Sequence, residues 1–424
     1  MHHTSSPGTP GGSRAVRGLT LTAATGLLLA ALPAGAAWAG GSRTWVVHPG
    51  QSIQSAVDQA RSGDTVKILP GTYQEGVCVD HKGLTVVGAG RDVTKIVWPE
   101  WKIPADLPEP QATPCWQAQN RADPDSDKST LRDDVSGLFF LDPDGPVSVK
   151  GVSTWNHPAD GIAAWGADGF RVTKTKGVGH GGYGILAADS SHSRISRNIE
   201  TGTDRGTPDR PSSGTAGIGV TDSTKAYAYV ASNDVEGYNI GVLAHEARSG
   251  GVANNFVSGN CVGLMVLDDA ATQVPDATRN VEAGDWQVNG NDLQANDRFC
   301  LGGVGETGAQ LRVSGTGVAV VNADHVDVRD NLIRDNVPSV DPASLNLPAG
   351  GLTLISLPPF AGPDGKDHGP VEDVQVTGNS FGRNKPVDVL LSSPAMGPHM
   401  RDVGPGIDIR ANHCANSTPA GLCG

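Results

Sequence analysis

The hydrophobic positions of this chain recur in short runs that begin with glycine. Each run has a glycine, three or four apolar or small residues and then a polar residue, as in GILAAD and GLMVLD. The shortest spacings between successive runs are 24, 23, 24 and 22 residues. The runs begin at Gly137, Gly161, Gly184, Gly217, Gly241, Gly263, Gly317 and Gly351. A period of about 22 residues indicates a repeat architecture.

A second unit, with asparagine at a turn, lies between these runs. Its first asparagines are Asn233, Asn255, Asn291, Asn331, Asn379 and Asn412. In the first five of these units a second asparagine follows five or six residues later. Asparagine suits tight turns, and its amide can hydrogen-bond to the equivalent amide of the next repeat, so we interpret this column as structural. Together the two units predict an all-β fold, a right-handed parallel β-helix whose coils stack about 4.8 Å apart around one core.

The start of the repeat region has a different pattern. Ile53, Ala56, Val57 and Ala60 share one face at helical spacing, which predicts a short amphipathic helix over residues 52–60. Apolar segments at 65–68 and 84–88 then predict the first strands. We expect the helix to cap the open end of the solenoid and shield its first coil from water.

Residues 1–39 have the features of a secretory signal peptide. Arg14 and Arg17 precede an apolar run from Leu19 to Leu32, and residues 37–39 (AWA) supply a small-residue cleavage site. The apolar run is shorter than the roughly 20 residues that a membrane-spanning helix needs. We therefore predict a secreted protein in which residues 40–424 form one β-helix domain, with a loop inserted at residues 98–135.

Charge and cysteine content narrow the partners and the compartment. The formal net charge is −13, which disfavours a nucleic acid or an anionic membrane as partner. It would also repel an acidic polysaccharide unless metal ions bridged the two. Six cysteines in an exported chain predict disulfides. Six cysteines allow 15 pairings, of which the repeat register favours Cys78–Cys115, Cys261–Cys300 and Cys414–Cys423. We expect a monomer, because the helix at one end hinders stacking of solenoids.

The segment IQSAVDQARSGDTVKILPGTY, followed by GLTVVGAG, resembles the opening of pectin-lyase-like β-helix proteins. The repeats after it resemble the NosD-like, or CASH-type, proteins of exported actinobacterial sequences. The resemblance extends from about Thr44 to Asn412 and implies the right-handed parallel β-helix. It implies no single activity, because this fold hosts lyases, hydrolases, epimerases, adhesins and proteins that are not enzymes.

Alignment of the runs on their glycine places acidic residues in one column. The fifth residues after the glycines are Asp142, Gly166, Asp189, Asp222, Glu246, Asp268, Asn322 and Ser356. In a solenoid such a column follows one edge, with neighbours about 5 Å apart. Three interpretations stay open: turn residues after each strand, a calcium site formed by Asp222, Glu246 and Asp268, and acid–base catalysis by neighbouring carboxyls.

The candidate catalytic residues belong to this column or lie next to it. They are Asp189, Asp222, Glu246, Asp268 and Asp269, with His245 and His180 as weaker candidates. His180 lies in the string GHG, which polygalacturonases also contain, but the NTD and RIK motifs of that family are missing here, so we do not transfer that activity. Loops at 201–216, 270–285, 300–316, 337–350 and 357–370 would wall a groove beside the column.

Two functions are compatible with these features. The first is a non-catalytic, NosD-like secreted protein that binds an extracellular polysaccharide or a cell-wall glycan, which the lack of a complete catalytic motif favours. The second is a polysaccharide lyase, epimerase or glycoside hydrolase that acts on a polyuronate in the groove, with or without calcium, which the walled acidic column favours. The sequence leaves open which of the two is correct.

Overall fold

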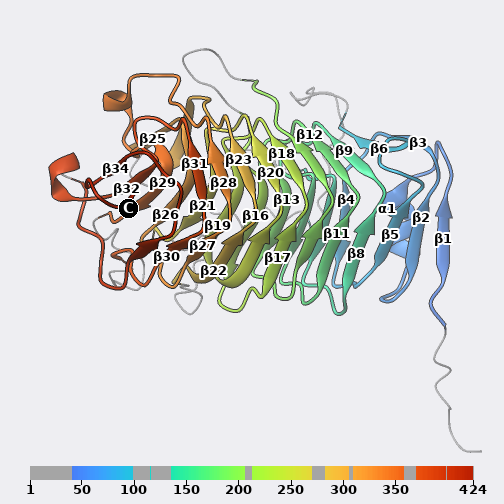
Figure 1. Ribbon diagram of the computed structural model, residues 1–424. Coiled ribbons are helices and arrows are strands. Elements are labelled where there is room, and N and C mark those ends of the chain that lie inside the picture. The colour runs from blue at the N-terminus through green and yellow to red at the C-terminus, as the bar shows by residue number, and fades with distance from the viewer. Residues whose placement is uncertain are drawn as a thin grey trace, which may run out of the picture. The chain divides into compact units, whose positions relative to one another are not determined.

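The computed structural model (Figure 1) describes residues 41–98, 115, 135–205, 213–269, 282–304, 309–357, 369–397 and 399–423. The predicted leader lies outside the described residues. So does most of the predicted insertion at 98–135, of which the structure describes Trp98, Cys115 and Val135. The chain from Ser42 onward forms one unit.

Three parallel sheets, called A, B and C, run along this unit, and each coil passes through them in that order. Sheet A contains β1 (Thr44–Val47), β2 (Thr65–Ile68), β5 (Thr85–Gly88), β8 (Val147–Lys150), β11 (Phe170–Thr173), β14 (Arg194–Ser196), β17 (Ala228–Ala231), the second half of β19 (Ile240–Ala253), β22 (Gly284–Asn289), β27 (Asp327–Arg329), β30 (Gln375–Thr377) and β33 (Asp408–Arg410). Sheet B contains β3 (Gly71–Tyr73), β6 (Thr94–Val97), β9 (Ser153–Trp155), β12 (Lys176–Val178), β15 (Ile199–Thr201), β18 (Asp234–Glu236), β20 (Phe256–Ser258), β23 (Asp292–Gln294), β28 (Leu332–Arg334) and β31 (Ser380–Gly382).

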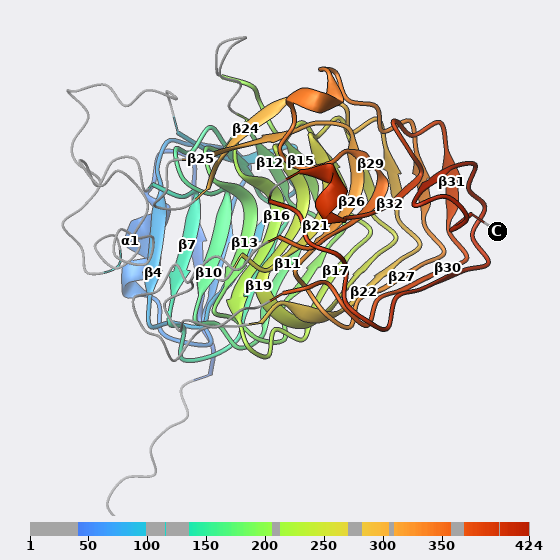
Figure 2. The ribbon, with the colours of Figure 1, turned by 90° about the vertical axis from the view of Figure 1, so that its left-hand side faces the viewer.

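Sheet C follows in the same coils, and Figure 2 shows its strands one after another from β4 to β32. It contains β4 (Val77–Asp80), β7 (Leu138–Leu141), β10 (Ile162–Trp165), β13 (Tyr183–Ala188), β16 (Ala216–Ser223), the first half of β19, β21 (Val262–Leu267), β26 (Thr316–Val321), β29 (Gly350–Ile355), β32 (Val389–Leu391) and β34 (Ser417–Thr418). The hairpin of β24 (Cys300–Val304) and β25 (Ala309–Val313) is antiparallel, and two short 3-10 helices span Pro342–Ser344 and Pro394–Met396. The chain thus has the predicted right-handed parallel β-helix fold.

The alternation of side chains along each strand explains the core. In sheet C, Ile185, Ile218 and Val242 align in successive coils, face inward and are buried. The side chains between them point outward, because successive residues of a strand face opposite sides of the sheet. One apolar cluster extends in this way from Val47 to Val389. A single coil could not bury these side chains, so the fold depends on stacking.

The predicted helix forms α1 (Ile53–Gln59). Its buried face consists of Ile53, Ala56 and Val57, and the side chain of Ser52 caps its N-terminus. Glu75 adds a second cap, since its carboxylate accepts a hydrogen bond from the backbone nitrogen of Ile53 at 2.6 Å. The helix packs against β1, β2 and β4, so it covers the N-terminal end of the core as expected.

Asparagine ladders close two corners in the later coils, which confirms the structural interpretation of the asparagine column. Between sheets A and B, Nδ2 of Asn233 donates to Oδ1 of Asn255 at 2.9 Å, and Asn255 donates to Asn291 at 2.9 Å. This ladder continues through Asn331 and Asn379 to Asn412 and begins at Asn198, one coil earlier than predicted. A second ladder, between sheets B and C, consists of Asn260, Asn296, Asn336 and Asn384.

A second apolar layer covers much of the outer face of sheet C. Leu243, Met265 and Ile355 pack there with Val313 of the hairpin and with Leu347. The described parts of segments 300–316 and 337–350, which were predicted as groove walls, therefore cover part of this face. Three disulfides tie the chain together, and their pairings are those that the register favoured: Cys78–Cys115, Cys261–Cys300 and Cys414–Cys423.

Candidate functional site

The column residues lie at the corner where the chain passes from sheet C to sheet A. Leu141 aligns with Trp165, and Leu267 aligns with Val321, so the residues after them occupy equivalent positions in successive coils. Left-handed backbone, with φ between 40° and 53°, occurs at Asp142, Asp189, Asp222, Glu246 and Asn322. This conformation favours glycine, asparagine and aspartate. The predicted alignment is confirmed, and turn geometry accounts for most of the column.

Asp268 and Ser356 have a different role, because a long insertion follows each of them. Oδ2 of Asp268 accepts a hydrogen bond from the backbone nitrogen of Ala283 at 2.8 Å. Oγ of Ser356 accepts one from the backbone nitrogen of Val371 at 3.0 Å. Each side chain thereby fixes the residue at which the chain re-enters the coil. For Asp268, predicted as a catalytic and calcium-binding residue, this contact supports a structural role.

Glu246 is the column member that turn geometry does not explain. Strand β19 runs through the corner without a break, and Glu246 lies at its bend with left-handed φ, where the other coils have shorter side chains. Its side chain is fully buried, and within the described residues no donor reaches either carboxyl oxygen. Because an unpaired buried carboxylate is costly, burial favours the neutral acid at this position.

His245 and Asp269 complete a cluster around Glu246. Nε2 of His245 lies 2.9 Å from Oδ1 of Asp269, which belongs to the next coil. One ligand atom from each of His245, Glu246 and Asp269 lies within 4.8 Å of the other two, and we call these three residues the corner cluster. Asp269 is its most accessible member, with 22% of its side chain exposed against 8% for His245.

The two buried members of the corner cluster hold protons at neutral pH. Burial and the negative charges of Asp269 and Asp222 raise the pKa of Glu246 to about 10, against the opposing charge of His245. Burial alone would lower the pKa of His245, but the charge of Asp269 and the hydrogen bond to it raise that pKa to about 10. The imidazolium of His245 therefore donates a hydrogen bond to Asp269, and a neighbouring positive charge favours an ionised carboxylate.

Asp222 lies one coil before Glu246 and has the opposite character from Asp269. It is buried, and its Oδ2 has no hydrogen-bond partner among the described residues. Burial raises the pKa of Asp222, and the charges of Asp189 and Asp269 add to this effect, although His245 opposes it. The corner thus holds two carboxyls that favour the proton, Asp222 and Glu246, beside Asp269, which pairs with an imidazolium. General acid and base catalysis requires carboxyls that differ in this way.

The corner cluster also has the composition of a metal site. Within the described residues it is the only group of three histidine, cysteine or acidic side chains whose ligand atoms come this close together. An imidazole with two carboxylates suits a transition metal such as zinc or manganese better than calcium, which takes oxygen ligands. Of the predicted calcium ligands, Glu246 belongs to this group, whereas Asp222 and Asp268 do not.

His180 lies elsewhere, at the start of sheet C and inside the coil. Its ring stacks on that of His157 with 5.6 Å between centroids, and its Nε2 lies 3.1 Å from Oγ1 of Thr154. Burial lowers the pKa of His180 well below its usual range. His180 is thus a neutral corner residue of the core and is separate from the corner cluster.

Sequence reasoning missed a buried acid in sheet B. Glu200 occupies the inward position of β15, where the next coils have Val235 and Val257. Neither of its carboxyl oxygens has a partner among the described residues, and burial raises its pKa well above the usual range. Alignment of the strands of sheet B would have found it, because Glu200 replaces an apolar residue of the period-two pattern.

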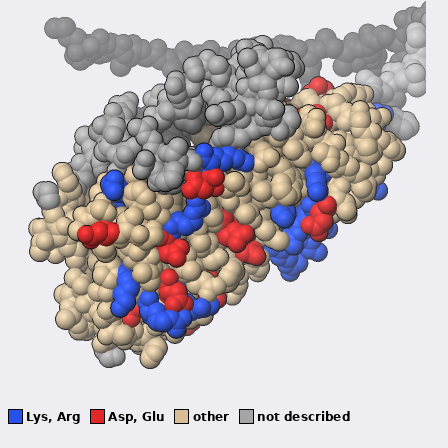
Figure 3. Space-filling model, turned by 90° about the horizontal axis from the view of Figure 1, so that it is seen from above, with Lys and Arg blue, Asp and Glu red and all other residues tan. Residues whose placement is uncertain are grey.

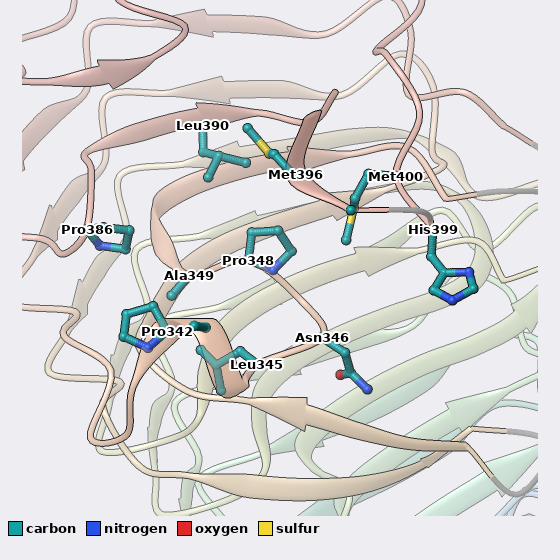
Figure 4. Close-up of a pocket in the computed structure, with 12 residues that line it drawn as sticks. Pro342, Leu345, Asn346, Pro348, Ala349, Pro386, Leu390, Met396, His399 and Met400 are labelled. Carbon is teal, nitrogen blue, oxygen red and sulfur yellow. The ribbon is translucent and has the colours of Figure 1, made fainter. Parts of the chain in front are cut away.

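A cavity of about 530 Å³ lies near the C-terminal end, between the two 3-10 helices. Figure 4 shows its lining, in which Leu390 of β32, Met396 and Met400 stand close to Pro348. The lining contains no carboxylate and no member of the corner cluster. Apart from Asn346 and His399 the lining is apolar, so the cavity offers mainly apolar contact.

Known proteins resemble this chain in structure but not in sequence. No family model and no curated protein matches the sequence. Among solved structures, the catalytic domain of a GH87 alpha-1,3-glucanase in complex with tetrasaccharides has a TM-score of 0.47 at 14% identity; the match covers 88% of this chain and 66% of that domain. A pectate lyase matches with a TM-score of 0.45 at 12% identity, covering 88% of this chain and 79% of that one.

A periplasmic alginate epimerase has a TM-score of 0.38 at 12% identity, with 82% of this chain and 71% of that one covered. At such low identity none of these likenesses determines the activity of this chain, and the NosD-like assignment stays a prediction. No helix among the described residues is long and apolar enough to cross a membrane.

Proposed function

We propose that this chain is an extracellular enzyme that hydrolyses a glycosidic bond of a polysaccharide by acid–base catalysis at the corner between sheets C and A. The observation that carries the proposal is the opposite character of the two carboxyls: Asp269 is partly exposed and bound to an imidazolium, whereas Asp222 is buried with a raised pKa. The extracellular location follows from the leader pattern and the disulfides. The substrate class follows from the resemblance of the N-terminal segment to pectin-lyase-like proteins.

In this mechanism Asp269 is the catalytic base and Asp222 the catalytic acid. Asp269 accepts a proton from the attacking water, while Asp222 donates a proton to the leaving-group oxygen. His245 and Glu246 are positioning residues, because they contact Asp269 and keep it ionised. The catalytic hydrogen bonds would shorten on substrate binding, as is usual for resting active sites.

Release of reducing ends from a panel of plant, fungal and bacterial polysaccharides tests this proposal. The variant Asp269→Asn should lose at least a hundredfold in rate, because loss of a general base typically costs two to four orders of magnitude. Asp142→Asn is the matched control, since Asp142 belongs to the same column, is exposed and has the same left-handed backbone that Asn322 adopts. It should keep full activity.

Two results would overturn the proposal. If Asp269→Asn cleaved as fast as the wild type, the chemistry would lie elsewhere. If the wild type bound one of the polysaccharides but released no ends from any of them, the non-catalytic function that the sequence favoured would be correct. Binding should therefore be measured with the same panel.

A second candidate, supported by the composition of the corner cluster, is a structural or catalytic transition-metal site. Titration of the protein with zinc and manganese in a calorimeter distinguishes it. Stoichiometric binding that is lost in both His245→Gln and Asp269→Asn would support a metal site. The metal ion, rather than the proton on Glu246, would then balance the negative charge of the cluster. No heat of binding would leave the acid–base mechanism as the explanation.

A further inference from the structure

The outer face of sheet A carries unpaired cations in its N-terminal half. Strands β8, β11 and β14 present Lys150, Arg171 and Arg194 to solvent, because the valine and isoleucine neighbours of these residues fill the inward positions. Lys174 and Arg197 follow at the next corner and are also exposed. Within the described residues none of these five side chains forms an ion pair.

The basic residues that the strands of this sheet carry in its C-terminal half are paired. In the C-terminal half, Arg329 lies 2.9 Å from Asp327, and Arg410 lies 3.1 Å from Asp408. Figure 3 shows one face of the molecule, on which several basic side chains lie beside acidic ones. A group of five unpaired cations is unexpected in a chain with a net charge of −13.

Exposed aromatic rings border these cations in the next coil. Tyr227 and Tyr229 are 47% and 42% exposed, although most large apolar side chains of the described residues are buried. The ring of Tyr227 stacks on His192 at 5.3 Å between centroids. Arg194 lies 5.9 Å from the ring centre of Tyr229 and donates a hydrogen bond to the backbone oxygen of Tyr227 at 2.8 Å, so rings and cations form one surface.

We infer that this surface, which we call the cationic face, binds an anionic polysaccharide of the polyuronate class. Carboxylates of the polymer would pair with Arg171 and Arg194, whose guanidinium groups suit carboxylates. The apolar faces of the sugar rings would pack on Tyr227 and Tyr229. Arg171, Arg194 and Tyr229 occupy equivalent positions in three successive coils, about 4.8 Å apart, which suits an extended polymer with repeated charges.

The polymer is a glycan rather than a nucleic acid for an electrostatic reason. A nucleic acid carries a dense line of phosphates, and a protein with a net charge of −13 repels it beyond the small cationic area. A polyuronate has weaker charge density, and its rings add apolar contact. The net charge of −13 predicts repulsion of an acidic polysaccharide unless metal ions bridge the two. The present inference departs from that prediction, because the cationic face concentrates positive charge on one sheet. The cationic face does not depend on the chemistry of the corner cluster.

Binding to immobilised polygalacturonate, measured by interferometry at pH 7 in low salt with EDTA present, tests this inference. EDTA removes divalent ions that could bridge two acidic molecules. The double variant R171Q/R194Q should bind about tenfold more weakly, and added salt should weaken the wild type in the same way. The matched control is R329Q/R410Q, which removes two paired arginines from the same sheet. Its affinity should equal that of the wild type, and thermal melts should confirm that both variants fold.

Three results would overturn the inference. The first is equal binding by R171Q/R194Q and the control. The second is equal binding of fully methyl-esterified polygalacturonate, which has the same sugar rings without the charge. The third is tighter binding of a thymidine oligonucleotide, which would assign the face to nucleic acid. R171Q/R194Q leaves the corner cluster intact, so this inference, measured by binding, and the proposed hydrolysis, measured by release of reducing ends, can fail separately.

Discussion

Replacement of Glu246 by glutamine tests whether the Glu246 carboxyl is protonated in the folded protein. The folded protein keeps Glu246 protonated up to a pKa of about 10, whereas the unfolded chain releases this proton near the ordinary value of 4.5. Between these two pKa values the folded state binds one more proton than the unfolded state. Stability therefore falls as the pH rises through this range, and Glu246 costs stability at neutral pH.

The magnitude follows from the distance between the working pH and the ordinary pKa. At pH 7 the interval is about 2.5 units, and each unit corresponds to about 1.4 kcal/mol, which gives an upper limit of about 3 kcal/mol. Glutamine has nearly the same shape, needs no proton and can still donate to Asp269. E246Q should thus raise the free energy of unfolding by up to about 3 kcal/mol at pH 7 and by little at pH 4.5. For a unit of about 380 residues this corresponds to about 4 °C in the thermal midpoint.

The assay is thermal and urea unfolding of both proteins at pH 5, 6, 7 and 8, with Glu236→Gln as control. Glu236 is an exposed acid of β18, so this control removes one carboxylate without touching the corner. The difference between E246Q and the wild type should grow with pH, while Glu236→Gln follows the wild type. A variant that is less stable than the wild type at pH 7, with an unchanged pH dependence, would refute the reasoning. It would show that Glu246 is ionised in the folded protein and balanced by a cation.

Three further predictions concern named contacts. Asp268→Ala should lower the free energy of unfolding by about 2 kcal/mol at pH 7, measured in urea, because the buried backbone nitrogen of Ala283 loses its acceptor; a loss of polysaccharide cleavage without any loss of stability would contradict the structural role. Asn291→Ala should lower the free energy of unfolding by about 3 kcal/mol, because it removes hydrogen bonds to Val252, Asn255 and Asn331. Asn289→Ala is the control in the same urea series and should be nearly neutral. The raised pKa of His245 contributes stability that is complete below about pH 6.5 and is lost as the pH rises towards 10. His245→Gln should therefore weaken the pH dependence of the thermal midpoint over this range. An unchanged pH dependence would show that His245 is neutral in the folded protein.

The coil architecture could be predicted because each coil repeats the same physical requirements. Inward positions must be apolar, corners need asparagine or left-handed residues, and these demands recur at a constant period in the sequence. The alignment on glycine therefore placed the column correctly at the corner between sheets C and A. The repeat register also favoured the three disulfides that form, of which Cys414–Cys423 closes a short loop.

The direction of side chains beyond a corner could not be predicted in this way. Asp268 and Asp269 are adjacent, yet Asp268 turns to the backbone of Ala283 while Asp269 turns to His245. This difference depends on the insertion that begins there, and the repeat pattern carries no information about it. Similarly, Arg171, Arg194 and Tyr229 meet only when three coils are stacked. The outer face of a solenoid has no periodic hydrophobic requirement that would reveal such a group.

The features that folding does not require are the best guide to function in this protein. The turn at Glu246 could use asparagine or glycine, as other coils do, and either would avoid a buried carboxyl without a donor. The arginines of β11 and β14 could have acidic neighbours, as Arg329 and Arg410 do. Ladders of hydrogen bonds and one continuous core stabilise the solenoid along its length. The fold can therefore tolerate a residue that locally lowers the free energy of unfolding. The corner cluster keeps a buried carboxyl that destabilises the fold, and the cationic face keeps unpaired charges. Both features therefore point to ligands at these two places.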